Sequence, residues 1–420
     1  MEYKLSELKN GLRVVLAPME SDTATVIVMT GTGSRYETKA ENGLAHFLEH
    51  MFFKGTKKRP SAKHISEELD AVGSQYNAFT AQDRTAYYAK VSSQYLNTAL
   101  DVISDIFINS TLPSKEIDKE RGAVIQEIDM YEDMPMRSVG DVFDELIYGA
   151  DHPLGRTILG PKENIRVFKR KDFDSYLKRH YVPSNTVVCV AGGFDEKKVL
   201  AKIKKEFGAL KAGNSSQALP YSSVQEKARV KIKEKKTDQT QLMLGVPAYP
   251  YLHKDEYALT VLNTILGGGM SSRLFTEVRE KRGLAYSVHS WTEKHPDTGY
   301  FVVQAGVEHG KLEKTVQTIL NELKKMKRTP VSAAELKKAK AYIKGTMTLS
   351  QDTSDEIAAA AASSVIRFGR VRTLEEIFKG IDKVTAKDVQ RVAKDIFKTS
   401  GLNLAIIGPH STDLSKLLKV

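Results

Sequence analysis

The feature that most constrains this sequence is an internal repeat whose period is half the chain. His64–Gly73 (HISEELDAVG) and Leu274–Gly283 (LFTEVREKRG) are each typical of a helix that ends at a glycine. The two glycines lie 210 residues apart in a chain of 420. After each of them the pattern predicts a strand, a polar turn, a second strand and a long helix. Such a series of elements at one offset indicates two homologous halves.

The repeated elements predict the fold class. They occur in pairs, one from each half: Ser74–Thr80 with Leu284–Trp291, Thr85–Val91 with Gly299–Val307, and Gln94–Phe107 with Lys311–Met326. Each half also ends in an apolar run closed by glycine, Val182–Asp195 and Ser400–Pro409. Because short strands joined by polar turns favour antiparallel pairing, we expect an α+β fold. Each of its two homologous halves would be a mostly antiparallel sheet covered by helices.

A change in composition marks the expected boundary between the halves. Lys211–Ser223 (KAGNSSQALPYSS) contains Gly, Asn, Ser and Pro with little apolar periodicity, as linkers do. We therefore expect a first half of residues 1–213, a linker of 214–223 and a second half of 224–420. A long helical stretch is expected over Ala333–Phe368, where Ala358–Ala362 would allow close helix packing.

Composition and charge exclude several classes of protein. The single cysteine, Cys189, rules out a disulfide framework and a cysteine-rich zinc site. No window approaches the ~18 apolar residues of a membrane span. The first residues lack the apolar region of a signal peptide, so we expect a cytoplasmic protein. The formal net charge is +11, but the lysines are scattered and no nucleic-acid-binding motif is present, so no nucleic-acid partner is expected.

The sharpest chemical feature is the segment HFLEH, which we expect on a helix with Asn42 as its N-cap and Gly55 just after its end. His46 and His50 are one turn apart, so their imidazoles can converge on one ion, and Glu49 lies beside them. Two neutral histidines and one carboxylate would leave the fourth position of a zinc ion open. That arrangement is typical of hydrolytic rather than structural sites.

A third protein ligand is expected from the acidic helix predicted over Ser114–Glu132. Glu120 and Glu127 are seven residues apart, which is two turns, and so they share a face. Acidic residues on a helix are by themselves typical of a solvated surface. The residues alone therefore leave both Glu120 and Glu127 open as the third ligand.

A family resemblance is carried by four blocks of sequence: NGLAHFLEHMFFKGT (Asn42–Thr56), ERGAVIQEIDMYEDMP (Glu120–Pro135), DHPLGRTILG (Asp151–Gly160) and LGGGMSSRLFTEVREKRGLAYSV (Leu266–Val288). With these blocks the chain resembles the pitrilysin family of inverted-motif zinc metallopeptidases. Within it the chain is most similar to the branch of the mitochondrial processing peptidase and its one-subunit bacterial and archaeal relatives. The resemblance spans the chain and implies a zinc-dependent endopeptidase or oligopeptidase with one Zn²⁺ per chain.

The resemblance also implies the roles of single residues in the first half. It makes His46, His50 and Glu127 the metal ligands, and Glu49 the general base for a metal-activated water. Glu120 matches the acidic position that supports the site from outside the ligand shell.

The second half lacks an HxxEH segment, and the resemblance implies that it supplies Arg279 and Tyr286 to the active site. The predicted strand after Gly73 would be a sheet edge, where substrate adds as an extended strand held at Asn77, Ala78 and Phe79.

The resemblance finally implies a partner. Relatives of this length pair two half-chambers around an enclosed cavity, so we expect a homodimer, or pairing with a related half-chamber subunit, and substrates that are peptides or unfolded segments. Gly267–Gly269 would form a mobile segment near substrate entry. The alternative is a non-catalytic or partner-dependent structural subunit of a heteromeric processing-peptidase-like complex. Because His46, Glu49, His50 and Glu127 are all present, the enzyme is favoured.

Overall fold

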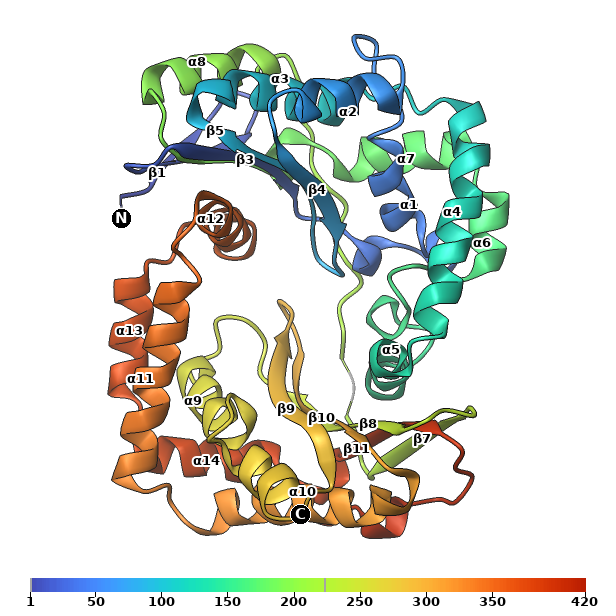
Figure 1. Cartoon of the computed structure of the whole chain (residues 1–420), viewed down its shortest axis with the longest axis vertical. Helices are drawn as coiled ribbons and strands as arrows, with labels where there is room; N and C mark the ends of the chain where they lie inside the picture. The colour runs from blue at the N-terminus through green and yellow to red at the C-terminus, as the bar shows by residue number, and fades with distance from the viewer. Residues whose placement is uncertain (1, 223) are drawn as a thin grey trace. The chain divides into compact units, whose positions relative to one another are not determined.

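The computed structural model describes residues 2–222 and 224–420, and these divide into two compact units (Figure 1). Unit 1 consists of Met1–Ile128, Arg156–Leu219 and Thr348–Thr373. Unit 2 consists of Asp129–Gly155, Pro220–Met347 and Leu374–Val420. Each unit is built around one β-sheet with helices packed on it, so the expected α+β class is confirmed.

The sheet of unit 1 has six strands in the order β1-β2-β6-β3-β5-β4. The strands are β1 (Lys4–Glu7), β2 (Arg13–Pro18), β3 (Thr23–Thr30), β4 (Gln75–Thr80), β5 (Thr85–Ser92) and β6 (Thr186–Gly192). Neighbouring strands pair antiparallel except β2 and β6, which pair parallel. As expected for the strand after Gly73, β4 lies at an edge of the sheet.

Helices cover both faces of this sheet. The larger core lies under the following helices: α1 (Leu44–Met51), α2 (Ala62–Asp70), α3 (Leu96–Asn109), α4 (Ser114–Glu132), α6 (Lys162–Val167), α7 (Arg170–His180) and α8 (Glu196–Phe207). On the other face, α12 (Ser354–Phe368) packs Ala358, Ala361 and Ala362 against Ile27 and Cys189. The alanines of α12 thus allow the close packing that the sequence predicts.

The sheet of unit 2 has five strands in the order β7-β11-β8-β10-β9. The strands are β7 (Arg229–Glu234), β8 (Thr240–Ala248), β9 (Ala285–Lys294), β10 (Gly299–Val307) and β11 (Asn403–Gly408). Here β7 and β11 pair parallel and the other neighbours pair antiparallel. This is the order of unit 1 without β1, element for element, so the repeat predicted from the sequence is confirmed.

The main core of unit 2 lies under α9 (Glu256–Gly267), α10 (Leu312–Arg328), α11 (Ala333–Leu349), α13 (Leu374–Lys383) and α14 (Ala386–Ile396). The opposite face of its sheet is covered by α5 (Pro135–Tyr148) through Val139, Phe143 and Ile147. Thus α5 comes from the first half of the sequence and covers the second sheet, whereas α12 comes from the second half and covers the first sheet. The compact units therefore differ from a division into 1–213 and 224–420 by two exchanged segments.

Three sequence-based expectations about local structure need refinement. The helical stretch expected over Ala333–Phe368 is two helices, because Thr353 forms a capping box with Glu356 that starts α12 anew. The segment before Gly283 contains a π-helix at Phe275–Glu280. In the expected linker, residues 214–222 have no regular secondary structure, and Ser223 lies outside the described residues.

No helix among the described residues is long and apolar enough to cross a membrane.

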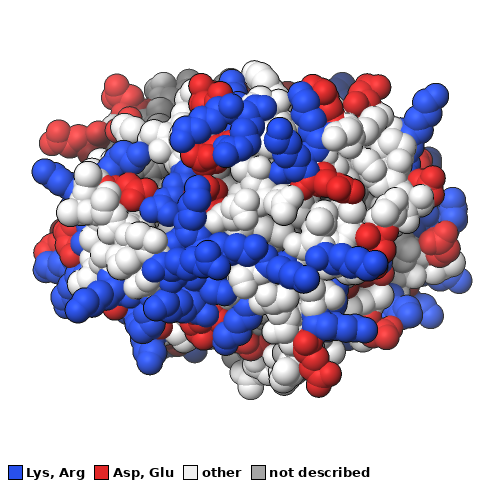
Figure 2. Space-filling model, turned by 90° about the horizontal axis from the view of Figure 1, so that it is seen from below, with Lys and Arg blue, Asp and Glu red and all other residues white. Residues whose placement is uncertain are grey.

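Lys and Arg side chains gather along a band on the face shown in Figure 2, with Asp and Glu among them. In unit 2, Lys324, Lys327 and Arg328 lie in the last turn and a half of α10. Positive charge is favourable there, because the C-terminal end of a helix dipole is negative. Burial, then the charges of Arg328 and Lys324, lower the pKa of Lys327.

Candidate metal centre and its surroundings

The helix that carries the HFLEH segment begins later than the sequence predicts. It starts at Leu44, and its N-cap is Gly43, whose φ of +98° lies in the left-handed region, so the expectation of an Asn42 cap is wrong. The reason is a buried carboxylate from outside the helix: Glu37 accepts hydrogen bonds from the backbone of Gly43 (2.9 Å) and Ala45 (2.7 Å). Gly55 does not follow the helix directly either, because α1 ends at Met51.

Three potential ligand atoms converge where α1 meets α4. His46 Nε2 and His50 Nε2 lie 3.3 Å apart, and Glu127 Oε2 lies 3.5 Å from the first and 3.3 Å from the second. For zinc bonds of about 2.0–2.1 Å, a tetrahedral arrangement separates the ligand atoms by about 3.3–3.4 Å. The spacing therefore fits a zinc ion. In the described part of the chain, these residues form the one His/Cys/Asp/Glu group that is close enough to hold a metal.

Glu120 touches this group from outside. Its Oε1 lies 2.9 Å from His50 Nδ1, and its Oε2 lies 2.6 Å from Lys54 Nζ. This contact leaves His50 Nε2 directed at Glu127, as a ligand atom must be. The two glutamates that the residues alone left open thus have different places, since Glu127 reaches both imidazoles and Glu120 reaches the back of one.

The carboxylates shift the protonation of the site. Burial lowers the pKa of His50, but the hydrogen bonds to Glu120 and Glu127 outweigh it and raise that pKa to about 9. The hydrogen bonds from His46 and His50 hold the pKa of Glu127 far below its usual range. Burial raises the pKa of Glu120, but His50 and Lys54 together lower it overall. The metal-free site therefore carries a proton that a metal ion must displace.

Glu49 points from α1 to the edge strand. Its Oε2 accepts a hydrogen bond of 2.5 Å from Thr80 Oγ1, at the end of β4. Sequence reasoning missed Thr80, Lys54 and Glu37. The first two lie inside the blocks QYNAFT and FFKGT, next to residues that it selected, whereas the distance of Glu37 from the helix left no local signal.

The expected substrate residues lie on β4 as follows. Asn77 pairs with Tyr88 and Ala78 with Tyr87 of β5. The backbone N–H of Ala78 donates to Asn77 Oδ1 over 2.8 Å and so faces the open edge of the sheet. The side chain of Phe79 packs into the core under α12.

In unit 2 the structure brings Arg279 and Tyr286 together. Arg279 Nη1 donates to the backbone oxygen of Tyr286 over 2.9 Å. The guanidinium lies between two rings, 4.8 Å from the centroid of Phe275 and 4.7 Å from that of Tyr286. Tyr286 is 77% exposed, which is unusual for a large aromatic side chain on a strand.

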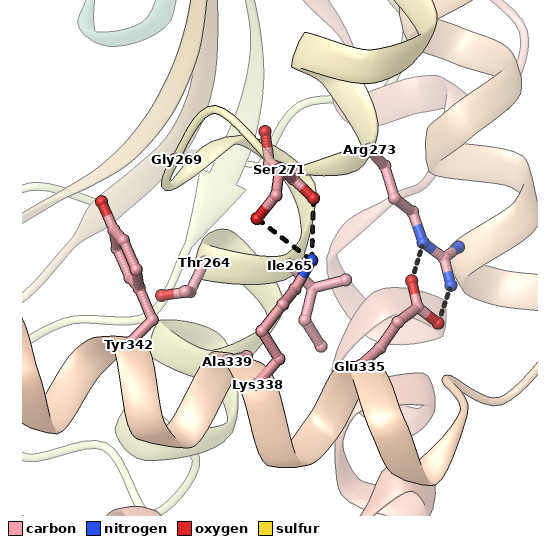
Figure 3. Close-up of a pocket in the computed structure, with 10 residues that line it drawn as sticks. Thr264, Ile265, Gly269, Ser271, Arg273, Glu335, Lys338, Ala339 and Tyr342 are labelled. Atoms are coloured by element: carbon pink, nitrogen blue, oxygen red, sulfur yellow. Dashed lines mark hydrogen bonds and ion pairs between the residues drawn. The ribbon is translucent and has the colours of Figure 1, made fainter.

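The Gly267–Gly269 run lies at the end of α9, beside a small pocket of about 40 Å³ lined by Thr264, Ser271 and Tyr342 among others. A Cβ at Gly267 would lie 2.5 Å from Ser290 Oγ, so close packing against β9 requires glycine there. Figure 3 shows two contacts that tie the following loop to α11. Arg273 pairs with both carboxylate oxygens of Glu335. Lys338 Nζ donates to the backbone oxygen of Ser271 over 2.9 Å. Mobility of this segment stays a prediction.

Comparison with known proteins agrees with this architecture over the whole chain. The family model "Insulinase (Peptidase family M16)" matches residues 13–162, and "Peptidase M16 inactive domain" matches residues 168–343. The chain is 37% identical over 402 residues to the uncharacterized zinc protease YmxG of Bacillus subtilis, covering 96% of this chain and 97% of the relative. An uncharacterized zinc protease of Rickettsia felis is 36% identical over 410 residues, which is 97% of this chain and 98% of the relative.

Solved structures show the same fold. A protease from Helicobacter pylori superposes with a TM-score of 0.90 at 27% identity, covering 97% of this chain and 99% of the other. A peptidase M16 inactive domain from Pseudomonas fluorescens superposes with a TM-score of 0.88 at 19% identity, covering 98% and 99%, and supports the fold alone. The chain is thus of the metallopeptidase class, with a His/His/Glu metal group in its peptidase domain. It belongs to peptidase family M16.

Proposed function

We propose that this protein hydrolyses peptide bonds in peptides or unfolded segments, with one zinc ion per chain held by His46, His50 and Glu127. The observation that carries the proposal is the spacing of the three ligand atoms, 3.3–3.5 Å. Glu49 lies on α1, the helix that carries both histidines. Three protein ligands leave one position of a tetrahedral ion for a water molecule or a substrate oxygen.

The chemistry that zinc would supply at these residues is a lowered pKa of a bound water and polarisation of the scissile carbonyl. Glu49 is the group that accepts the proton of that water and delivers it to the leaving amine. Glu120 holds His50 by its Nδ1, which directs Nε2 at the metal position, where the ion would displace the proton. As the family resemblance implies, Arg279 and Tyr286 would stabilise the negative charge that develops on the carbonyl oxygen.

The substrate aligns with β4 as an added strand. An edge strand offers backbone N–H and C=O groups that recognise any extended peptide with little demand on its sequence. Ala78 would donate its N–H to the peptide after Asn77 Oδ1 releases it, and Asn77 and Phe79 flank that position. A second copy of the chain, or a related half-chamber subunit, would enclose this edge, as expected for peptidases that exclude folded proteins.

The test is cleavage of a quenched fluorescent peptide library by the purified protein, as isolated, with a chelator, with zinc restored, and as Glu49→Gln. The proposal predicts cleavage that chelator abolishes and zinc restores. It also predicts that Glu49→Gln loses cleavage while binding one zinc per chain by elemental analysis. A wild-type protein that binds one zinc per chain yet cleaves nothing would overturn it, and would favour the non-catalytic subunit. Light scattering on the same sample measures whether two copies associate.

A further inference from the structure

A threonine at the end of β4 contacts the proposed general base. Thr80 Oγ1 donates to Glu49 Oε2 over 2.5 Å. Among the described residues, Thr80 is the only hydrogen-bond partner of the Glu49 carboxylate. A carboxylate on a helix has free rotation about its terminal bond, so a donor on a second element selects one orientation of it. The bond uses one oxygen, Oε2, and leaves Oε1 to act on a water.

The backbone around Thr80 is fixed by several hydrogen bonds. The turn after it closes with Ala81 N donating to Arg84 O over 2.8 Å. The carbonyl oxygens of Ala81 and Gln82 accept from the backbone of Ser34 (3.3 Å) and Arg35 (2.9 Å). The hydroxyl of Thr80 is therefore placed by a braced hairpin end, and Thr itself is stiff at χ1 because it is β-branched. A hydroxyl on a short, stiff side chain can therefore fix the orientation of the Glu49 carboxylate more closely than a donor on a long, flexible side chain.

The same strand carries the proposed substrate edge. Tyr76 and Ala78 contact the core under α1, as Thr80 contacts Glu49 on α1, whereas Phe79 packs on the other face. This is the alternation of a strand, in which every second residue shares a face. Ala78, whose N–H faces the open edge, thus lies two residues from the donor that holds the base. A peptide aligned on β4 would share one rigid element with the group that orients Glu49.

We propose that Thr80 is a positioning residue that orients the Glu49 carboxylate and couples its position to the strand on which substrate aligns. The inference rests on the proposed function, because it concerns the same reaction. Thr80 exchanges no proton in the reaction and keeps its hydroxyl as a donor throughout. Its contribution is orientation, so its loss should affect turnover rather than binding.

The experiment compares Thr80→Val, which removes the hydroxyl and keeps the shape, with Thr80→Ser, which keeps the hydroxyl. Thr23→Val is the matched control, because Thr23 is a half-buried strand threonine at the other end of the same sheet. We expect Thr80→Val to lower kcat about 10- to 100-fold with KM changed less than about twofold. Zinc affinity and Tm should stay at wild-type values, Thr80→Ser should restore kcat to within about threefold, and Thr23→Val should be unchanged.

Three results would overturn the inference while wild-type cleavage upholds the proposed function. They are a Thr80→Val enzyme with wild-type kcat, equal losses in Thr80→Val and Thr80→Ser, and a loss of kcat that follows a loss of zinc or of folded protein. If Thr80→Val does not fold, Thr80→Ala, which also lacks the hydroxyl, takes its place, and wild-type kcat in Thr80→Ala would overturn the inference. Absence of cleavage in the wild type would instead refute the proposed function itself.

Discussion

Lys54 and His50 bind opposite oxygens of one carboxylate: Lys54 Nζ lies 2.6 Å from Glu120 Oε2, and His50 Nδ1 lies 2.9 Å from Glu120 Oε1. Lys54 follows α1 by less than one turn, and Glu120 lies on α4, so the ion pair fixes the two helices that carry the ligand atoms. A carboxylate held from both sides cannot rotate away from the imidazole. Lys54 is thus part of the support of the metal centre.

Removal of the Lys54 charge should weaken zinc binding. In Lys54→Met the Glu120 carboxylate loses one of its two partners, and we expect the affinity for zinc to fall about 10-fold, as for other groups just outside a ligand shell. Competition with a chromophoric chelator measures this. Lys57→Met is the control, because Lys57 is exposed on the same loop. An unchanged zinc affinity in Lys54→Met would show that the ion pair between Lys54 and Glu120 does not contribute to zinc binding.

Substitution of Glu127 and of Glu120, both on α4, should affect zinc binding to different degrees. Glu127→Gln removes a charged ligand atom that lies within 3.5 Å of both imidazoles, so the variant should be isolated without zinc. Glu120→Gln removes a supporting group and should bind zinc about 10- to 100-fold more weakly. Glu116→Gln, on the same helix, should behave as wild type. Elemental analysis after dialysis against a weak chelator separates the three, and stoichiometric zinc in Glu127→Gln would exclude Glu127 as a ligand.

Much of the fold could be predicted because the repeat appears in local patterns. The range Gly299–Val307 expected for a strand is that of β10, and the edge strands β4 and β9 each follow a glycine that ends a helical segment. The exchange of α5 and α12 could not be predicted in this way. An amphipathic helix shows that it has an apolar face, but its sequence does not state which sheet covers that face.

The metal centre was predictable where its residues are close in sequence. The spacing of His46 and His50 places them on one side of one helix, whatever surrounds it. Glu120 and Glu127 share a face of α4, so only the tertiary contact of α4 with α1 distinguishes their contacts with the histidines. The cap of α1 by Glu37 is also a tertiary contact, since capping patterns in sequence extend only a few residues.

The proposed role of the Tyr286 hydroxyl can be tested by its removal. Tyr286→Phe removes the hydroxyl but keeps the ring on which the Arg279 guanidinium lies. If the hydroxyl stabilises the oxyanion, kcat should fall about 10- to 100-fold with little change in Tm, because the side chain is largely exposed. His289→Ala, an exposed position on the same strand, is the control. Wild-type kcat in Tyr286→Phe would assign Tyr286 to another role.

Arg59 should be important for the stability of unit 1. Its side chain is 1% exposed and pairs with Glu68 (2.6 Å), Asp101 (2.5 Å) and Asp105 (2.8 Å). Arg59→Met would leave these carboxylates without their shared cation, and we expect a loss of about 3 kcal/mol in the free energy of unfolding. In Arg170→Met, an exposed ion pair is lost, and the expected change is below about 1 kcal/mol. Urea unfolding measures both, and equal effects would contradict the structure.

Glu37 should make stability depend on pH. Burial raises the pKa of this carboxyl to about 7, although the backbone of Ala45, the side chain of Asn42 and the backbone of Gly43 donate to it. The folded state therefore holds the proton more tightly than the unfolded state, whose carboxyl has a pKa near 4.5. The resulting stabilisation is fully present below about pH 4.5 and is lost as the pH rises through about 7. Over this window the loss is about 3 kcal/mol.

Glu37→Gln removes the titration and keeps an oxygen that can accept from the start of α1. The difference in unfolding free energy between wild type and variant should therefore change by about 3 kcal/mol between pH 4.5 and pH 8 in metal-free protein, with wild type relatively weaker at the higher pH. Urea unfolding at a series of pH values measures the difference. Glu41→Gln is the matched control, because the lowered pKa of Glu41 confines its pH dependence to below about pH 4.5 and predicts a nearly flat difference over this window. A wild-type-minus-variant difference that is flat from pH 4.5 to 8 would mean that Glu37 stays ionised when buried.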